Sequence, residues 1–246
     1  MRSLIAGNWK MHGTLAWARD QARRLAEKAA SGLPCDVLIC PPATLLGTVA
    51  EPLRNAGILV GAQDCHHATH GAFTGDIAAT MLADLGCSHV LVGHSERRTI
   101  HRESSHDAMR KAVAAHQAGL IAIVCIGENR DERRAGKAFE TAAGQLARSL
   151  PADATAANTV IAWEPVWAIG TGDTANAADV VAMHRLVKQQ LSALLGDGVR
   201  VLYGGSVNPS NSRELLAIEH VDGLLVGGAS LDPDIFWQIA TDGAPD

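Results

Sequence analysis

Eight short apolar runs recur along the chain, and longer segments with helical periodicity lie between them. Several of these runs are apolar at every position, which is typical of strands that a parallel sheet buries on both faces. Runs of this length are too short for helices, so the pattern predicts strands. The predicted strands cover residues 4–7, 37–40, 59–62, 90–92, 121–125, 160–163, 201–203 and 223–226.

Amphipathic helices are predicted between these strands. Residues 14–30 and 177–195 place apolar side chains three and four positions apart, as one face of a helix requires. Strands that alternate with helices favour a parallel α/β sheet with right-handed crossovers. Such a sheet either closes into a barrel or stays open and doubly wound, and periodicity alone does not distinguish the two. An eight-stranded α/β barrel needs ~250 residues, so the 246 residues present predict one domain over 1–246.

Composition narrows the classes of function. The net charge is −5 at pH 7 with no long run of one sign, which argues against nucleic acid or a membrane surface as the main partner. The sequence has no apolar stretch of ~18 residues, so no transmembrane helix is predicted. The first residues lack the apolar region of a signal peptide. The five cysteines form no CxxC pair, so neither a disulfide framework nor a zinc clasp is expected. We therefore expect a cytoplasmic protein.

Polar residues and glycines follow the predicted strands at the point where each strand ends. Asn8 and Lys10 follow the first strand, His94 follows the fourth, and Glu164 follows the sixth. Because the carboxyl ends of parallel strands meet at one end of the fold, these side chains should gather where such folds bind ligands. Glycine pairs at 204–205 and 227–228 follow the last two strands, where they let backbone N–H groups approach a phosphate closely.

Each of these residues also has a structural interpretation. Lys10 could be a solvated loop lysine, and His94 could cap a helix or lie in the core. The glycine pairs could be turn residues only. Glu164 is harder to explain in this way, because it places a carboxylate at the mouth of a buried strand. The convergence of charged residues at one end, rather than any single residue, is the argument for an active site.

Seven segments resemble those of one known family. They are GNWKM (7–11), GAFTGD (71–76), VGHSERR (92–98), CIGE (125–128), WEPVWAIGTG (163–172), YGGSVNP (203–209) and DGLLVGGASL (222–231). Their order and spread make the chain resemble the triosephosphate isomerases along essentially its full length. The resemblance implies a closed (β/α)8 TIM barrel. It also implies an intramolecular oxidoreductase, an aldose–ketose isomerase of glycolysis and gluconeogenesis that interconverts dihydroxyacetone phosphate and D-glyceraldehyde 3-phosphate through an enediolate, with no cofactor or metal.

The resemblance also implies roles for individual residues. Glu164 would be the base that shuttles the proton and His94 the electrophile, a pairing already known for this family. The start of a helix directly after His94 would disfavour an imidazolium. The catalytic group would be Glu164, His94, Lys10 and Asn8, and the substrate-binding residues would be Asn8, Lys10, Gly170, Ser206, Gly227 and Gly228. Supporting residues would be Ser95, Glu96 as the partner of Lys10, and Tyr203, whose hydroxyl would meet the backbone near Ala175.

The polar loop 64–76 has two interpretations. Its Asp-Cys-His-His run at 64–67, with His70 nearby, resembles a metal-binding cluster, but adjacent histidines rarely converge on one ion. In the resembled family this loop inserts into the other subunit of a homodimer, and we favour that interpretation, with Thr74 near the tip. Asp64, Asp76 and Asp173 stand where asparagine, glutamate and lysine are usual. The first two bear on the interface, and the third bears on the lid that residues 165–175 would form.

Two rival functions stay open at this point. An aldolase-type barrel would use Lys10 to form a Schiff base with a keto sugar phosphate. A non-catalytic phosphate-binding barrel should have lost at least one of Lys10, His94 and Glu164, and all three are present.

Overall fold

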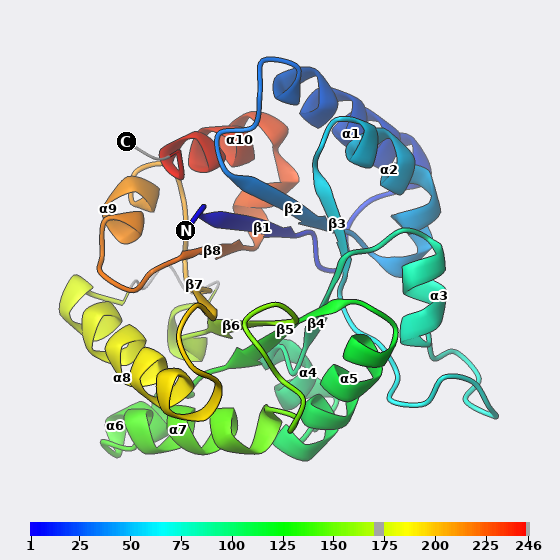
Figure 1. Ribbon diagram of the computed structural model, residues 1–246. Helices are drawn as coiled ribbons and strands as arrows, with labels where there is room; N and C mark the ends of the chain where they lie inside the picture. The colour runs from blue at the N-terminus through cyan, green and yellow to red at the C-terminus, as the bar shows by residue number, and fades with distance from the viewer. Residues whose placement is uncertain (170–174, 245–246) are drawn as a thin grey trace.

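The computed structural model describes residues 1–169 and 175–244, whose eight parallel strands form a closed barrel in the order β1 to β8. The helices lie around the outside of this barrel (Figure 1). The closed (β/α)8 TIM barrel is thereby confirmed, and the open doubly wound sheet is excluded. The strands are β1 Leu4–Asn8, β2 Asp36–Cys40, β3 Leu59–Ala62, β4 His89–Val92, β5 Ile121–Ile126, β6 Thr159–Trp163, β7 Arg200–Tyr203 and β8 Gly223–Val226.

The predicted strands 59–62 and 223–226 match the structure, and each of the other six is one residue longer than predicted. Most of the added residues are polar, among them Asn8, Asp36, His89 and Arg200. An apolar pattern misses such residues because the ends of the barrel carry polar side chains while the backbone still pairs as a strand.

The helices occupy the connections between strands. The predicted helix 177–195 matches α8, and the predicted helix 14–30 is α1 with its two capping residues. Asn176 caps α8 by accepting the backbone N–H of Asp179. No helix within the described residues is long and apolar enough to cross a membrane. The helices are α1 Leu15–Ala29, α2 Ala43–Asn55, α3 Ala79–Asp84, α4 Ser95–Ile100, α5 Ser105–Gln117, α6 Arg130–Arg134, α7 Ala138–Ser149, α8 Ala177–Leu195, α9 Ser212–Leu216 and α10 Pro233–Asp242, with short 3₁₀ turns η1 Val166–Ala168 and η2 Gly228–Leu231.

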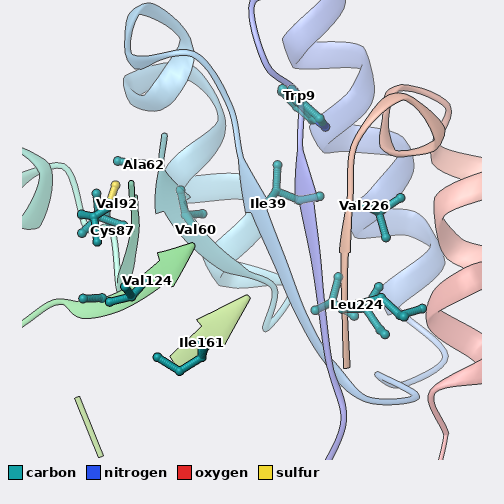
Figure 2. Close-up of a cluster of buried hydrophobic side chains, with 14 of the residues drawn as sticks. Trp9, Ile39, Val60, Ala62, Cys87, Val92, Val124, Ile161, Leu224 and Val226 are labelled. Atoms are coloured by element: carbon teal, nitrogen blue, oxygen red, sulfur yellow. The ribbon is translucent and has the colours of Figure 1, made fainter. Parts of the chain in front are cut away.

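The apolar side chains form two separate layers. Alternate residues of the strands fill the inside of the barrel, and the residues between them face outward against the helices. Figure 2 shows part of the larger, outer layer, with Trp9, Ile39, Val60 and Ile161 among its members. The inner layer is made of Leu4, Ala6, Leu38, Cys40, Leu91, Ile123, Cys125, Val160, Ala162, Leu202 and Leu225. This packed interior leaves the strand ends as the places where polar side chains can gather.

Candidate active site

The sequence-predicted polar residues meet at the carboxyl end of the barrel. Asn8 is the last residue of β1, and Glu164 directly follows β6. Lys10 and His94 lie two residues beyond β1 and β4. These four residues line a cavity of about 390 Å³, together with Ile169, Gly204, Gly205, Ser206, Val207, Leu225, Gly227, Gly228 and Ala229. Gly170, also expected to bind substrate, and Asp173 lie outside the described residues.

Glu164 is 2 % exposed and its carboxylate accepts several hydrogen bonds. Ser95 donates its backbone N–H to Oε2 at 2.9 Å and its hydroxyl to Oε1 at 3.1 Å. Nε2 of His94 lies 3.0 Å from Oε1. Burial by itself raises the pKa of Glu164, but the electrostatic interaction with His94 and the hydrogen bonds from His94 and Ser95 outweigh burial and hold the pKa below its ordinary value. The carboxyl group is therefore ionised and able to accept a proton.

His94 is the N-cap residue of α4, and its Nδ1 accepts the backbone N–H of Glu96 at 3.2 Å. That bond requires an unprotonated Nδ1, so the ring proton is on Nε2, which faces Glu164. Burial lowers the pKa of His94, whereas the charge and hydrogen bond of Glu164 outweigh burial and raise it. The cap thereby aims the Nε2 donor of His94 at Glu164 and into the cavity.

Lys10 is held from several sides. Its Nζ lies 2.5 Å from Oε1 of Glu96, as expected, and its backbone N–H donates to Oδ1 of Asn8 at 2.9 Å. The φ angle of Lys10 is 51°, a left-handed conformation that is uncommon outside glycine. Gln63 donates to the carbonyl of Lys10 at 2.8 Å and to that of Cys40 at 2.9 Å. Sequence reasoning missed Gln63, although its place directly after a predicted strand was a signal for it.

The small residues after β7 and β8 also border the cavity. A Cβ atom at Gly227 would lie 3.3 Å from Cε of Lys10, whereas one at Gly228 would meet nothing within 4 Å. The chain at Gly227 therefore approaches the lysine closely, and the space beside Gly228 is open. Ser206 lines the same cavity. A phosphate held here would be close to the ammonium of Lys10 and to backbone N–H groups.

Tyr203 is fully buried and lies at the end of β7. Burial raises the pKa of its hydroxyl to about 12, while the nearby backbone of Ala175 lowers it. The hydroxyl forms no hydrogen bond of ordinary geometry with the described residues. The hydroxyl thus lies beside the backbone of Ala175, as expected, but outside ordinary hydrogen-bond geometry.

Glu128 supports the chain on both sides of Glu164. This fully buried carboxylate accepts the indole N–H of Trp163 at 3.0 Å and that of Trp167 at 2.8 Å. The guanidinium of Arg133 lies 4.1 Å from the centroid of a Trp167 ring. The sequence suggested only a structural role for Glu128, and its shared use by two indoles was not foreseen.

A second hollow of about 820 Å³ opens beside Lys10. Its lining includes Asp64 and Lys111, which belong to a ring of four alternating charges. Lys111 pairs with Asp64 at 2.7 Å and with Glu103 at 2.6 Å, and Arg97 pairs with the same two acids at 2.9 Å. His66 in loop 64–76 stacks on Phe73 at 4.1 Å between ring centroids. No group of three His, Cys, Asp or Glu side chains in the described parts of the chain is placed to hold a metal ion.

Comparisons with known proteins agree with this geometry. Residues 3–242 match the family model described as triosephosphate isomerase. The chain is 52% identical over 246 residues to a triosephosphate isomerase of Chelativorans sp. (strain BNC1), with 98% of this chain and 96% of that protein covered. It is 50% identical over 244 residues to one of Rhizobium meliloti (strain 1021), with 97% and 95% covered. The crystal structure of the Bartonella henselae triosephosphate isomerase superposes with a TM-score of 0.91 at 44% identity, covering 98% of this chain and 99% of that one. The chain therefore belongs to the triosephosphate isomerase family.

Proposed function

We propose that Glu164 and His94 carry out the aldose–ketose isomerisation of this family in the 390 Å³ cavity. Glu164 accepts a proton from the hydroxymethyl carbon of dihydroxyacetone phosphate and returns it to the neighbouring carbon. Between the two transfers the substrate is an enediolate, and its oxygens receive the N–H that His94 directs into the cavity. The hydroxyl proton of the first carbon passes by way of His94 to the oxygen of the second, so that the first carbon becomes the aldehyde. The product, D-glyceraldehyde 3-phosphate, has the same atoms as the substrate, so the reaction consumes no co-reactant.

The observation that carries this proposal is the approach of His94 Nε2 to Glu164 Oε1 at 3.0 Å inside a nearly buried pocket. An acceptor for a carbon-bound proton and a donor for an oxygen are thereby side by side. To reach the substrate carbon, the carboxylate must leave its hydrogen bonds to Ser95. Lys10 adds positive charge for the phosphate and the enediolate, and Asn8 orients Lys10 through its backbone N–H.

Neither rival function is favoured. A Schiff-base aldolase needs a neutral amine, whereas Nζ of Lys10 is paired with Glu96 at 2.5 Å. A non-catalytic phosphate-binding barrel has no use for the ionised carboxylate of Glu164 beside an imidazole. A coupled isomerase assay of the purified chain tests the proposal, and borohydride reduction in the presence of dihydroxyacetone phosphate tests the aldolase. Trapped adduct without isomerase activity would reverse the assignment.

We further propose that the protein is a homodimer in which loop 64–76 of one subunit fills the 820 Å³ hollow of the other. Exposed apolar side chains border this region, with Met11 94%, Ile100 71% and Phe73 44% exposed. Large exposed apolar side chains that cluster in this way mark protein interfaces. Light scattering at micromolar concentration should give twice the mass of the 25.8 kDa chain, and a monomeric mass with full activity would contradict the proposal.

We also place this protein in the cytoplasm. All five cysteines are free and buried, which suits a reducing compartment. Activity should be unaffected by a chelator, and a loss that zinc restores would revive the histidine cluster as a metal site.

A further inference from the structure

The chain beyond β5 lies against the chain that carries Glu164. Strands β5 and β6 pair up to Ile126 and Trp163, and the backbone N–H of Glu164 then donates to the carbonyl of Ile126 at 2.7 Å. Gly127 comes next. A Cβ atom at Gly127 would lie 1.7 Å from the carbonyl oxygen of Glu164, so no other residue fits without displacing that backbone. The position of Gly127 therefore determines how far the backbone of Glu164 can settle toward β5.

Gln145 of α7 holds Gly127 with both ends of one side-chain amide. Its Oε1 accepts the backbone N–H of Gly127 at 2.8 Å, and its Nε2 donates to the carbonyl of Gly127 at 3.0 Å. The amide thus takes the place of a neighbouring strand at a point where β5 has already ended. An amide both accepts and donates here, whereas a carboxylate cannot donate and a thioether does neither well.

We propose that Gln145 is a positioning residue for the catalytic base, acting through Gly127. Gln145 contributes nothing to the lining of the substrate cavity. Its effect comes instead from the rigid contact between Gly127 and the Glu164 carbonyl. Misplacing a reacting group by about 1 Å can reduce a rate by up to ~10²-fold, even when the altered residue is remote from the chemistry. The inference rests on the proposed role of Glu164.

Two variants and one matched control test this inference. Gln145→Met keeps the length of the side chain but loses both hydrogen bonds, and Gln145→Glu sets a carboxylate against the carbonyl of Gly127. Gln189→Met, at an exposed position of α8, changes the same residue type away from the site. For each protein, kcat and KM are measured, together with the primary isotope effect on substrate deuterated at the carbon that loses its proton. Each kcat is divided by the folded fraction of the protein, which circular dichroism gives.

A misplaced base slows proton abstraction without weakening phosphate binding. We expect kcat to fall about tenfold or more for both Gln145 variants, with KM within about twofold and a larger isotope effect, because proton transfer then limits the rate. Gln189→Met should match the wild type. A purely stabilising role for Gln145 would lower the melting temperature and leave kcat and the isotope effect of the folded enzyme unchanged, which would overturn the proposal. Failure of both variants to fold at 10 °C would also overturn it, because stability would then explain the residue.

Glu164→Gln separates this inference from the function on which it rests. If that variant keeps its activity, Glu164 is not the base and the proposed function fails regardless of Gln145. If that variant is inactive while both Gln145 variants equal the wild type, only the role of Gln145 fails. The double variant Gln145→Met/Glu164→Asp gives a third result. Less than additive losses are expected, because both changes act on the placement of one carboxylate.

Discussion

The two ends of the barrel use polar residues in different ways. At the carboxyl end, Lys10 has a left-handed backbone, and His94 and Glu164 face an open cavity. At the amino end, Asp36 of β2 pairs with Arg200 of β7 at 2.6 Å, and His89 of β4 is buried with its Nδ1 2.8 Å from the Ser88 hydroxyl. The carboxyl end leaves reactive side chains facing a cavity, whereas the amino end pairs its polar groups with one another. The difference indicates that substitutions at the two ends should separate activity from stability.

The largest expected effect is at the carboxyl end. Glu164→Gln should fold and lose ~10²–10⁴-fold in kcat, because an amide cannot accept a proton from carbon. Its melting temperature should be unchanged or slightly lower, since His94 and Ser95 outweigh burial in favouring the native carboxylate. A coupled assay and thermal unfolding measure the two quantities. A variant that keeps more than about a tenth of the wild-type kcat would remove Glu164 as the base.

A matched pair of histidines sharpens the comparison. His94→Asn keeps an acceptor near the position of Nδ1, so the cap of α4 can persist, but it removes the Nε2 donor. Loss of one donor to a developing oxyanion costs ~10²–10³-fold in kcat. His89→Asn, the same change at the amino end, should leave kcat and KM as they are. Equal losses in the two variants would show that this histidine-to-asparagine change acts through the fold and not through the site.

The contribution of the amino end to stability should depend on pH through His89. Burial, followed by the charge of Arg200, lowers the pKa of His89 from 6.5 to about 4. The unfolded chain therefore binds a proton that the folded chain excludes, so stability is complete above pH 6.5 and falls as the pH drops from 6.5 toward 4. A gap of this size corresponds to at most about 3 kcal/mol. Between pH 7 and 4, the free energy of unfolding measured with denaturant should change less for His89→Asn than for the wild type. The same pH dependence in both proteins would exclude His89 as the source of the acid sensitivity.

The smallest expected effect comes from the ion pair between the first and last parts of the barrel. Arg200→Met removes the main partner of Asp36, whose side chain is 24% exposed, so solvent moderates the loss. We expect about 1–2 kcal/mol lower free energy of unfolding and no change in kcat. Lys10→Met is the counterpart at the carboxyl end and should lose activity with little loss of stability. If Arg200→Met instead slows the reaction while the protein stays folded, the two ends are not independent.

The sequence alone predicted the eight strands, and the polar residues that it placed at one end of the fold do meet there. Apolar runs identified all eight strands within one residue, because a strand buried on both faces must be apolar throughout. The polar residues that follow these runs marked the carboxyl end of the barrel, since every strand runs in the same direction. The pairing of Lys10 with Glu96 followed from the resemblance, and the structure contains it.

Other contacts depended on tertiary packing. Barrel closure could not be read from periodicity, because an open and a closed parallel sheet bury the same alternation of strands and helices. Gln145 lies 18 residues from Gly127 in an ordinary amphipathic helix, and nothing in that pattern indicates which backbone its amide will reach. The same is true of Glu128, whose two oxygens are divided between Trp163 and Trp167. Local periodicity determines which face of an element is buried, but only the docking of helices onto a closed barrel brings particular polar atoms within hydrogen-bonding distance.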